Sequence, residues 1–111
     1  MSQGPNVNTP KHKIELSFAC RDLVDLDVVT LTDPFLRIYE QIGNNWTKIG
    51  ETEVIYNSLH PQFAKSFLID FYFENKQPFR VEVYHHDSAT KQVLIGIYII
   101  MQARSNSSCR T

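Results

Sequence analysis

The chain is dominated by short segments in which apolar and polar residues alternate. The clearest runs from Lys13 to Cys20, where Ile14, Leu16 and Phe18 fall on one face. A period of two is the pattern of a half-buried β-strand. Further strands, rich in β-branched and aromatic residues, are predicted at 35–42, 46–55, 63–73, 79–85 and 94–101. Short strands at regular spacing, with almost no helical periodicity, predict an all-β antiparallel sandwich.

Turn signals separate these segments. Gly43-Asn44-Asn45 predicts a hairpin between the second and third strands, and Pro61 forbids a strand through the loop around it. At 111 residues the chain is expected to form one domain, with residues 11–101 as its body. Residues 1–10 and 102–111 are polar and show no strand pattern, so both are predicted to be disordered.

Composition excludes several classes of function. The net charge is −1, from 11 basic and 12 acidic residues, so no global field favours a nucleic-acid partner. No run reaches the roughly 18 apolar residues of a membrane-spanning helix, and residues 1–10 lack the apolar core of a signal peptide. There is no G-x-S-x-G, no glycine-rich phosphate loop and no H-E-x-x-H, so the chain is not predicted to be an enzyme.

The two cysteines, Cys20 and Cys109, lack the spacing of a metal site or a redox motif. Cys20 is in phase with the apolar face of the first strand. This position predicts a reduced thiol in the core. A reduced thiol implies a reducing compartment such as the cytosol.

Carboxylates are concentrated where predicted strands end. Asp27 and Asp33 lie six residues apart after the first strand, and Asp87 follows the strand at 79–85. The apolar tip of the first loop consists of Val28, Val29 and Leu31. Oxygen donors gathered at one end of a sandwich are the kind of site that a hard cation prefers. The sequence therefore predicts that the three aspartates meet at one pole of the fold.

The stretch from about residue 11 to residue 96 resembles a C2 domain, and specifically the first C2 domain of a copine. The resemblance is carried by IELSFACRDLVDLDVVTLTDPF, WTKIGETEVI, NSLHPQF, FLIDFYFE and FRVEVY. It implies a type II sandwich of eight strands that binds calcium between its tip loops and docks on anionic phospholipid. Copines continue into a second C2 domain and a von Willebrand factor A-like domain, so this chain is expected to be a short or truncated member.

The family pattern implies five acidic ligand positions for calcium. Asp27, Asp33 and Asp87 match three of them, whereas His85 and Val93 stand at the other two. Calcium takes about 6–8 oxygen ligands, and its affinity follows the number of charged ones. The resemblance therefore implies calcium-dependent phospholipid binding with a weak calcium response. It also implies a cytoplasmic protein that is recruited peripherally to the plasma membrane.

Three alternatives stay open for the tip. A protonated His85 among the aspartates would replace part of the missing metal charge. His85 and His60 together with the aspartates would offer the mixed donors that zinc accepts. The third is a C2 scaffold that binds a protein partner and ignores calcium and lipid.

Two further expectations concern surfaces. Some C2 domains bind phosphoinositides through a basic cluster, and here Arg37, Lys48 and Lys65 are predicted to make only a weak patch because Glu51 and Glu53 interrupt them. The eighth strand expected beside residues 13–20 is not evident in the sequence. An uncovered edge along the first strand would favour self-association or low stability.

Overall fold

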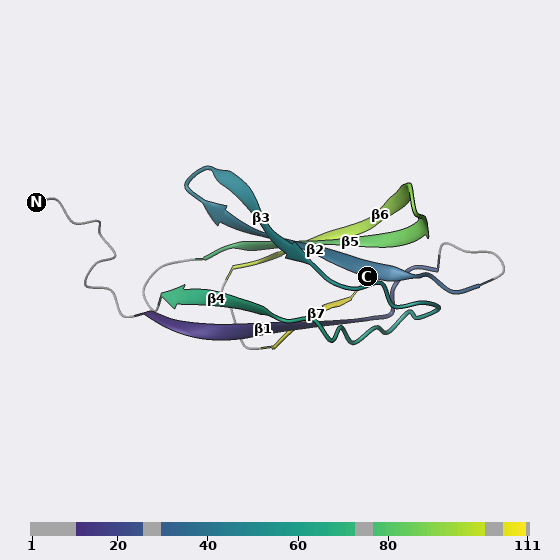
Figure 1. The fold of residues 1–111 in the computed structure, drawn as a ribbon, viewed down its shortest axis with the longest axis horizontal. Coiled ribbons are helices and arrows are strands. Elements are labelled where there is room, and N and C mark those ends of the chain that lie inside the picture. The colour runs from purple at the N-terminus through teal and green to yellow at the C-terminus, as the bar shows by residue number, and fades with distance from the viewer. Residues whose placement is uncertain (1–10, 26–29, 73–76, 102–105, 111) are drawn as a thin grey trace, which may run out of the picture.

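The computed structural model describes residues 11–25, 30–72, 77–101 and 106–110. Its strands are β1 (Lys11–Arg21), β2 (Pro34–Ile42), β3 (Asn45–Glu51), β4 (Phe67–Tyr72), β5 (Phe79–Ser88), β6 (Lys91–Ile100) and β7 (Asn106–Arg110). They form two sheets, ordered β3-β2-β5-β6 and β4-β1-β7, which lie one over the other (Figure 1). The predicted all-β sandwich is confirmed. The described part of the chain contains no helix with the length and apolarity that a membrane crossing requires.

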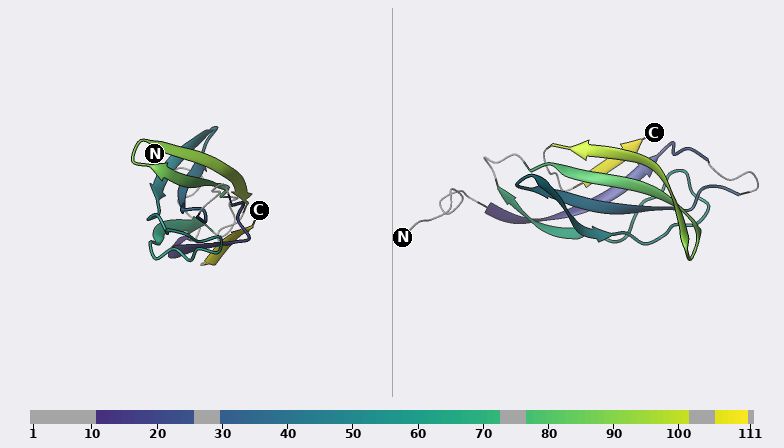
Figure 2. Two further views of the ribbon diagram at one scale, coloured as in Figure 1. Left: turned by 90° about the vertical axis from the view of Figure 1, so that its right-hand side faces the viewer. Right: turned by 90° about the horizontal axis from the view of Figure 1, so that it is seen from above.

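The register of the larger sheet aligns its apolar positions on one face. Leu36 lies opposite Val83, and Ile38 lies opposite Val81, in the antiparallel β2–β5 ladder. These side chains point at the smaller sheet, where Leu16 and Phe18 of β1 complete the core. The end-on view shows the two sheets as separate layers (Figure 2, left).

A glycine makes the hairpin between β2 and β3. Gly43 has φ of 62°, in the left-handed region that costs other residues steric strain. A second glycine, Gly50 on β3, has another role, since a Cβ there would lie 2.6 Å from Cε1 of Phe67. Close contact between the sheets therefore depends on the missing side chain at Gly50.

The third and fourth predicted strands are shorter than expected. β3 ends at Glu51 rather than at residue 55, and β4 begins at Phe67 rather than at residue 63. The Glu53 carboxylate accepts hydrogen bonds from the N–H groups of Ala64, at 2.6 Å, and Lys65, at 3.2 Å. These contacts satisfy the N–H groups of residues 64 and 65 from a side chain instead of a neighbouring strand. Residues 52–66 form a loop despite their apolar pattern.

The segment after residue 101 differs from its prediction as well. β7 pairs with β1 from Ser17 to Arg21, so this part of the β1 edge is covered. The pairing is parallel, whereas every other ladder is antiparallel. Main-chain hydrogen bonds do not require alternating apolar side chains, so a polar sequence can form this strand.

The state of Cys20 is a further correction. Cys20 is disulfide-bonded rather than reduced, and the register sets Cys109, the other cysteine of the chain, opposite it. A reduced thiol was the argument for a reducing compartment, and that argument no longer holds. The bond lies at the end of β1, where the first tip loop begins.

Candidate functional site

Asp33 and His85 are tied together at one end of the sandwich. The N–H of Asp33 donates to Nδ1 of His85 at 3.0 Å, and the N–H of His86 donates to the carbonyl of Asp33 at 2.9 Å. His85 is 3% exposed, because β5 places it on the same inward face as Val83. A ring nitrogen that accepts an N–H carries no proton. This hydrogen bond therefore gives no support to the hypothesis of a protonated His85 that replaces the metal charge.

Asp87 lies beside the same histidine. Its Oδ1 is 4.0 Å from Nε2 of His85, so strand alternation brings residues 85 and 87 to one side, as expected. Its Oδ2 is 3.5 Å from Nζ of Lys91, at the start of β6. The ammonium of Lys91 thus occupies one side of a carboxylate that was predicted to bind calcium. We had not anticipated Lys91, although a spacing of four residues around a tight β5–β6 turn was a visible signal.

The carboxylate of Asp33 is fixed by the loop that follows β3. Its Oδ1 accepts the N–H of Asn57 at 2.8 Å, and Asn57 adopts a left-handed φ of 56° to present that N–H. Thr32, which is fully buried, donates its hydroxyl to the carbonyl of Val24 at 2.8 Å. Its own carbonyl accepts the N–H of Ser58. The base of the first loop is therefore preorganised before any ligand binds.

The apolar part of the tip is accessible where the structure describes it. Leu31 is 41% exposed, and Val24, which we had not predicted to contribute, is 49% exposed. Of the other predicted tip residues, Asp27, Val28 and Val29 lie outside the described residues. Two half-exposed aliphatic side chains close to Asp33 give this end of the sandwich an amphipathic character.

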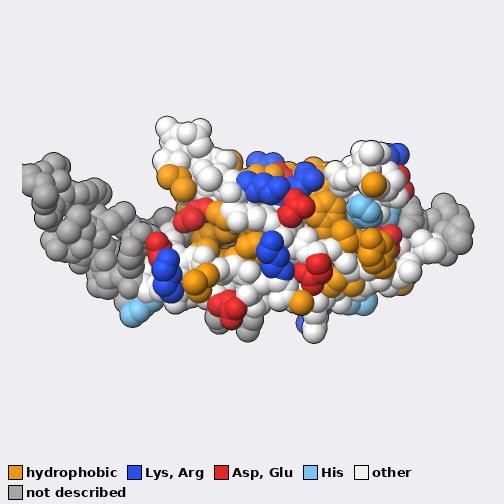
Figure 3. Space-filling view, viewed as in Figure 1, with side chains coloured by type: hydrophobic (Ala, Val, Ile, Leu, Met, Phe, Trp, Pro, Cys, Tyr) orange, Lys and Arg blue, Asp and Glu red, His pale blue; other side chains and the backbone are white. Residues whose placement is uncertain are grey.

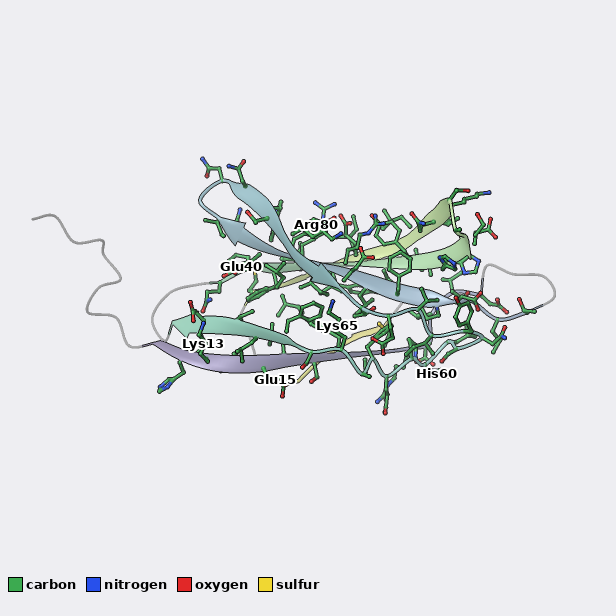
Figure 4. All side chains as sticks on the ribbon, in the orientation of Figure 1. Lys13, Glu15, Glu40, His60, Lys65 and Arg80 are labelled. Carbon is green, nitrogen blue, oxygen red and sulfur yellow. The ribbon has the colours of Figure 1, made fainter. Side chains whose placement is uncertain are left out.

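The other histidines of this region are occupied by structural contacts. Nδ1 of His60 accepts the N–H of Asp22 at 3.0 Å, and Figure 4 places His60 at the same end of the sandwich as the β5–β6 turn. His86 points away from His85, with its ring edge-on to Phe35 and Tyr56. Within the described ranges no group of three or more His, Cys, Asp or Glu residues has metal-binding geometry. The described residues therefore give no support to the zinc alternative.

Arg37 and Lys48 of the predicted basic cluster share one carboxylate, in agreement with the expected weak patch. Lys48 Nζ lies 2.8 Å from Oε1 of Glu51, and Arg37 Nε lies 3.3 Å from the same oxygen. The hydrogen bond from Lys48, joined by the one from Arg37, lowers the pKa of Glu51 and keeps it charged. Basic and acidic side chains lie interspersed over the middle of the face in Figure 3.

The outer face of the larger sheet carries a second packed cluster. The rings of Phe35 and Tyr84 are stacked with centroids 5.4 Å apart, and the Arg37 guanidinium lies 4.5 Å from the Tyr84 centroid. Burial and the hydrogen bond that Tyr84 donates to Glu82 raise the pKa of Tyr84. Arg80 also pairs with Glu82, at 2.7 Å. Because the polar groups of this cluster pair with one another, it stiffens β2 and β5 instead of offering a free cationic site.

Comparison with known proteins supports the observed fold. The sequence profile of the C2 domain matches residues 16–110. Nicotinic receptor-associated protein 1 of Caenorhabditis elegans is 37% identical over 98 residues, covering 73% of this chain and 16% of that protein. Copine-E of Dictyostelium discoideum is 39% identical over 95 residues, covering 79% of this chain and 16% of that protein. The chain thus spans about a sixth of the length of these relatives.

A solved structure supports the fold. The structure described as BON1-C2B superposes with a TM-score of 0.63 at 22% identity, covering 90% of this chain and 70% of that one. At this level of identity the likeness concerns the fold alone. The arrangement of the two sheets is therefore the feature that this chain shares with it.

Proposed function

Because the chain belongs to the C2 domain family, we propose that it is a copine-like, non-enzymatic module that docks on anionic phospholipid in response to calcium. The observation that carries the proposal is the position of Asp33 and Asp87, which both contact His85 at the end that exposes Leu31. Carboxylates beside exposed aliphatic groups form a surface that repels an anionic membrane until a cation neutralises it.

In this proposal a hard cation would be held by a reduced set of ligands, one of which lies outside the described residues. Asp33 and Asp87 offer carboxylate oxygens, and Asp27 is the third proposed ligand. A bound calcium ion would supply positive charge and open coordination sites for lipid phosphate oxygens. The chain's own part is to hold Asp33 through Asn57 and to present Leu31 and Val24 to the interface.

Docking by this tip has an estimable apolar contribution. Each buried CH₂ contributes about 0.8 kcal/mol, so full insertion of Leu31 would contribute up to about 2 kcal/mol, or roughly thirtyfold in affinity. Val24 would contribute somewhat less because its side chain is shorter. The proposed localisation is cytoplasmic with recruitment to the plasma membrane, and an affinity of this moderate size would make that recruitment reversible.

In this proposal the weak response to calcium has a structural basis. His85 stands where the family pattern has a carboxylate, and its Nδ1 is occupied by Asp33. Lys91 adds a positive charge 3.5 Å from Asp87. Both features lower the net negative charge that attracts a divalent ion.

Those same features favour one alternative function, a calcium-independent module that binds a protein partner. In that case the Asp87–Lys91 pair would replace the cation permanently. The alternative predicts a chain that sediments equally little with vesicles in calcium and in chelator.

Vesicle sedimentation of the whole chain tests the proposal. Calcium should increase binding to phosphatidylserine vesicles but not to phosphatidylcholine vesicles. Asp87→Asn should reduce that calcium effect at least about tenfold, a loss near 1.4 kcal/mol. Asp70→Asn is the matched control, because Asp70 also pairs with a lysine, Lys13 at 2.8 Å, but belongs to β4. Equal loss in both variants, or no calcium effect in the native chain, would refute the proposal.

A further inference from the structure

β6 forms an open edge of the larger sheet. It pairs with β5 on one side and, among the described residues, with no strand on the other. With ten residues it is among the longest strands, and it lies along one margin of its sheet in the right-hand view of Figure 2. The unpaired side therefore presents a row of main-chain donors and acceptors about 34 Å long.

The sequence of this edge lacks the usual protection against pairing. Residues 92–101 contain no charged residue and no proline. Leu94, Ile97 and Ile99 point outward and are about half exposed. Natural edge strands commonly carry charges, prolines or a short length that prevents association with another edge. Apart from Lys91 at its first position, none of these features is present along β6.

The other described margins of the two sheets do carry such protection. β3, at the far side of the same sheet, contains Lys48 and Glu51. β4 has six residues and includes Asp70, which forms an ion pair with Lys13. The contrast singles out β6 as the margin adapted to contact another strand.

We propose that β6 is a self-association surface and that its occupant is β6 of a second copy of this chain. Two copies related by a two-fold axis perpendicular to the sheet would pair their β6 strands antiparallel. The same face of each sheet then points the same way, so in a ladder centred on Ile97 the Ile97 side chains of the two copies meet, with Ile99 of each copy diagonal to Ile97 of the other. Cross-strand pairs of β-branched residues are favourable in such ladders.

Charge distinguishes this pairing from the other contacts that two copies can make. Lys91 lies at the very start of β6, so antiparallel pairing centred on Ile97 keeps both ammonium groups at the ends of the ladder. Pairing of β6 with β3 or β4 would instead set Lys48 or Asp70 against the apolar stripe. Both charges are ion-paired, Lys48 with Glu51 and Asp70 with Lys13, and removing such a pair from water carries a desolvation cost.

The size of the contact predicts a weak dimer. A strand edge about 34 Å long and about 10 Å deep falls short of the roughly 800 Å² per partner of a standard stable interface. Association should therefore depend on concentration, with a dissociation constant on the order of 10 µM. The surface is distinct from the lipid tip, so its test does not depend on calcium or membranes.

Sedimentation velocity of the whole chain between about 1 and about 200 µM tests the inference. The native chain should shift from monomer to dimer, and Ile97→Lys should remain monomeric throughout. Leu68→Lys is the matched control, since Leu68 is an exposed aliphatic residue on the β4 edge, at 68% against 45% for Ile97. It should dimerise as the native chain does.

Thermal melts by circular dichroism establish that each variant is folded. Should Ile97→Lys not fold, Ile97→Thr keeps the β-branched shape while adding a hydroxyl, and it should weaken the dimer at least about threefold. A native chain that is monomeric at the highest concentration would overturn the inference. Equal loss of dimer in Ile97→Lys and Leu68→Lys, or open-ended growth beyond the dimer, would also overturn it.

Discussion

Replacement of His85 by aspartate should convert the tip into a site whose stability depends on calcium. His85 occupies a position where the C2 pattern has a carboxylate, and its Nε2 lies 4.0 Å from Oδ1 of Asp87. Two unit negative charges 4 Å apart repel by about 1 kcal/mol in a water-like medium and by about 4 kcal/mol at an effective dielectric constant near 20. Position 85 is buried whereas Asp87 is about half exposed, so the cost should lie between these limits.

His85→Asn is the control that isolates the charge, because asparagine and aspartate have the same size. In the native chain the N–H of Asp33 donates a hydrogen bond to Nδ1 of His85. Either replacement side chain offers an oxygen to this N–H. In chelator, His85→Asp should therefore melt below His85→Asn by about 4–15 °C, taking about 4 °C per kcal/mol for a domain of this size. A mechanism based on lost packing alone would lower both melting temperatures equally.

Calcium should then close the gap between the two variants. A ligand at one hundred times its dissociation constant stabilises a folded state by about 2.7 kcal/mol. Melting curves at increasing calcium, with magnesium as the cation control, measure this effect. If the difference between His85→Asp and His85→Asn is the same in calcium and in chelator, the carboxylates do not share a cation and the reasoning is refuted.

Three further results are expected from stability measurements. Gly50→Ala should cost about 1–3 kcal/mol, because its Cβ would lie 2.6 Å from the buried Phe67 ring, and a urea melt should show a lower midpoint. Burial alone would raise the pKa of Glu53. The hydrogen bonds that its carboxylate accepts from backbone N–H groups outweigh the effect of burial, so the pKa of Glu53 is lowered. A carboxylate with a lowered pKa stabilises the fold at pH values above its unfolded-state pKa, which is near 4.3, and this stabilisation is lost as the pH falls through the pKa of the folded state. Glu53→Gln should therefore flatten the acid side of the curve of stability against pH. Cys20→Ala should lower stability under oxidising conditions and remove its dependence on reductant, which thermal melts with and without dithiothreitol compare.

The strands that alternate were predictable, because burial on one face imposes period two on them. β1, β2 and β5 lie close to their predicted bounds for this reason. The ends of β3 and β4 were not predictable, since they depend on Glu53 reaching backbone groups eleven and twelve residues away. β7 was missed because main-chain pairing leaves no mark in a polar sequence.

For the tip, sequence reasoning could place the residues but could not define their contacts. The inward direction of His85 and the common side of His85 and Asp87 follow from strand alternation. The hydrogen bond from Asp33 joins residues 52 positions apart, and no local pattern encodes it. Roles in binding calcium remain a prediction for Asp27, Asp33 and Asp87.

The pairing of β1 has a consequence for how the chain reaches this structure. β1 has no neighbour nearby in the sequence, since its partners are residues 67–72 and 106–110. During synthesis the hairpin of β2 and β3 can form early, whereas β1 has to remain unpaired until its partners, residues 67–72 and 106–110, have been synthesised. Sheets that depend on such distant partners form slowly, and an unpaired strand with alternating apolar residues is a typical target of chaperones.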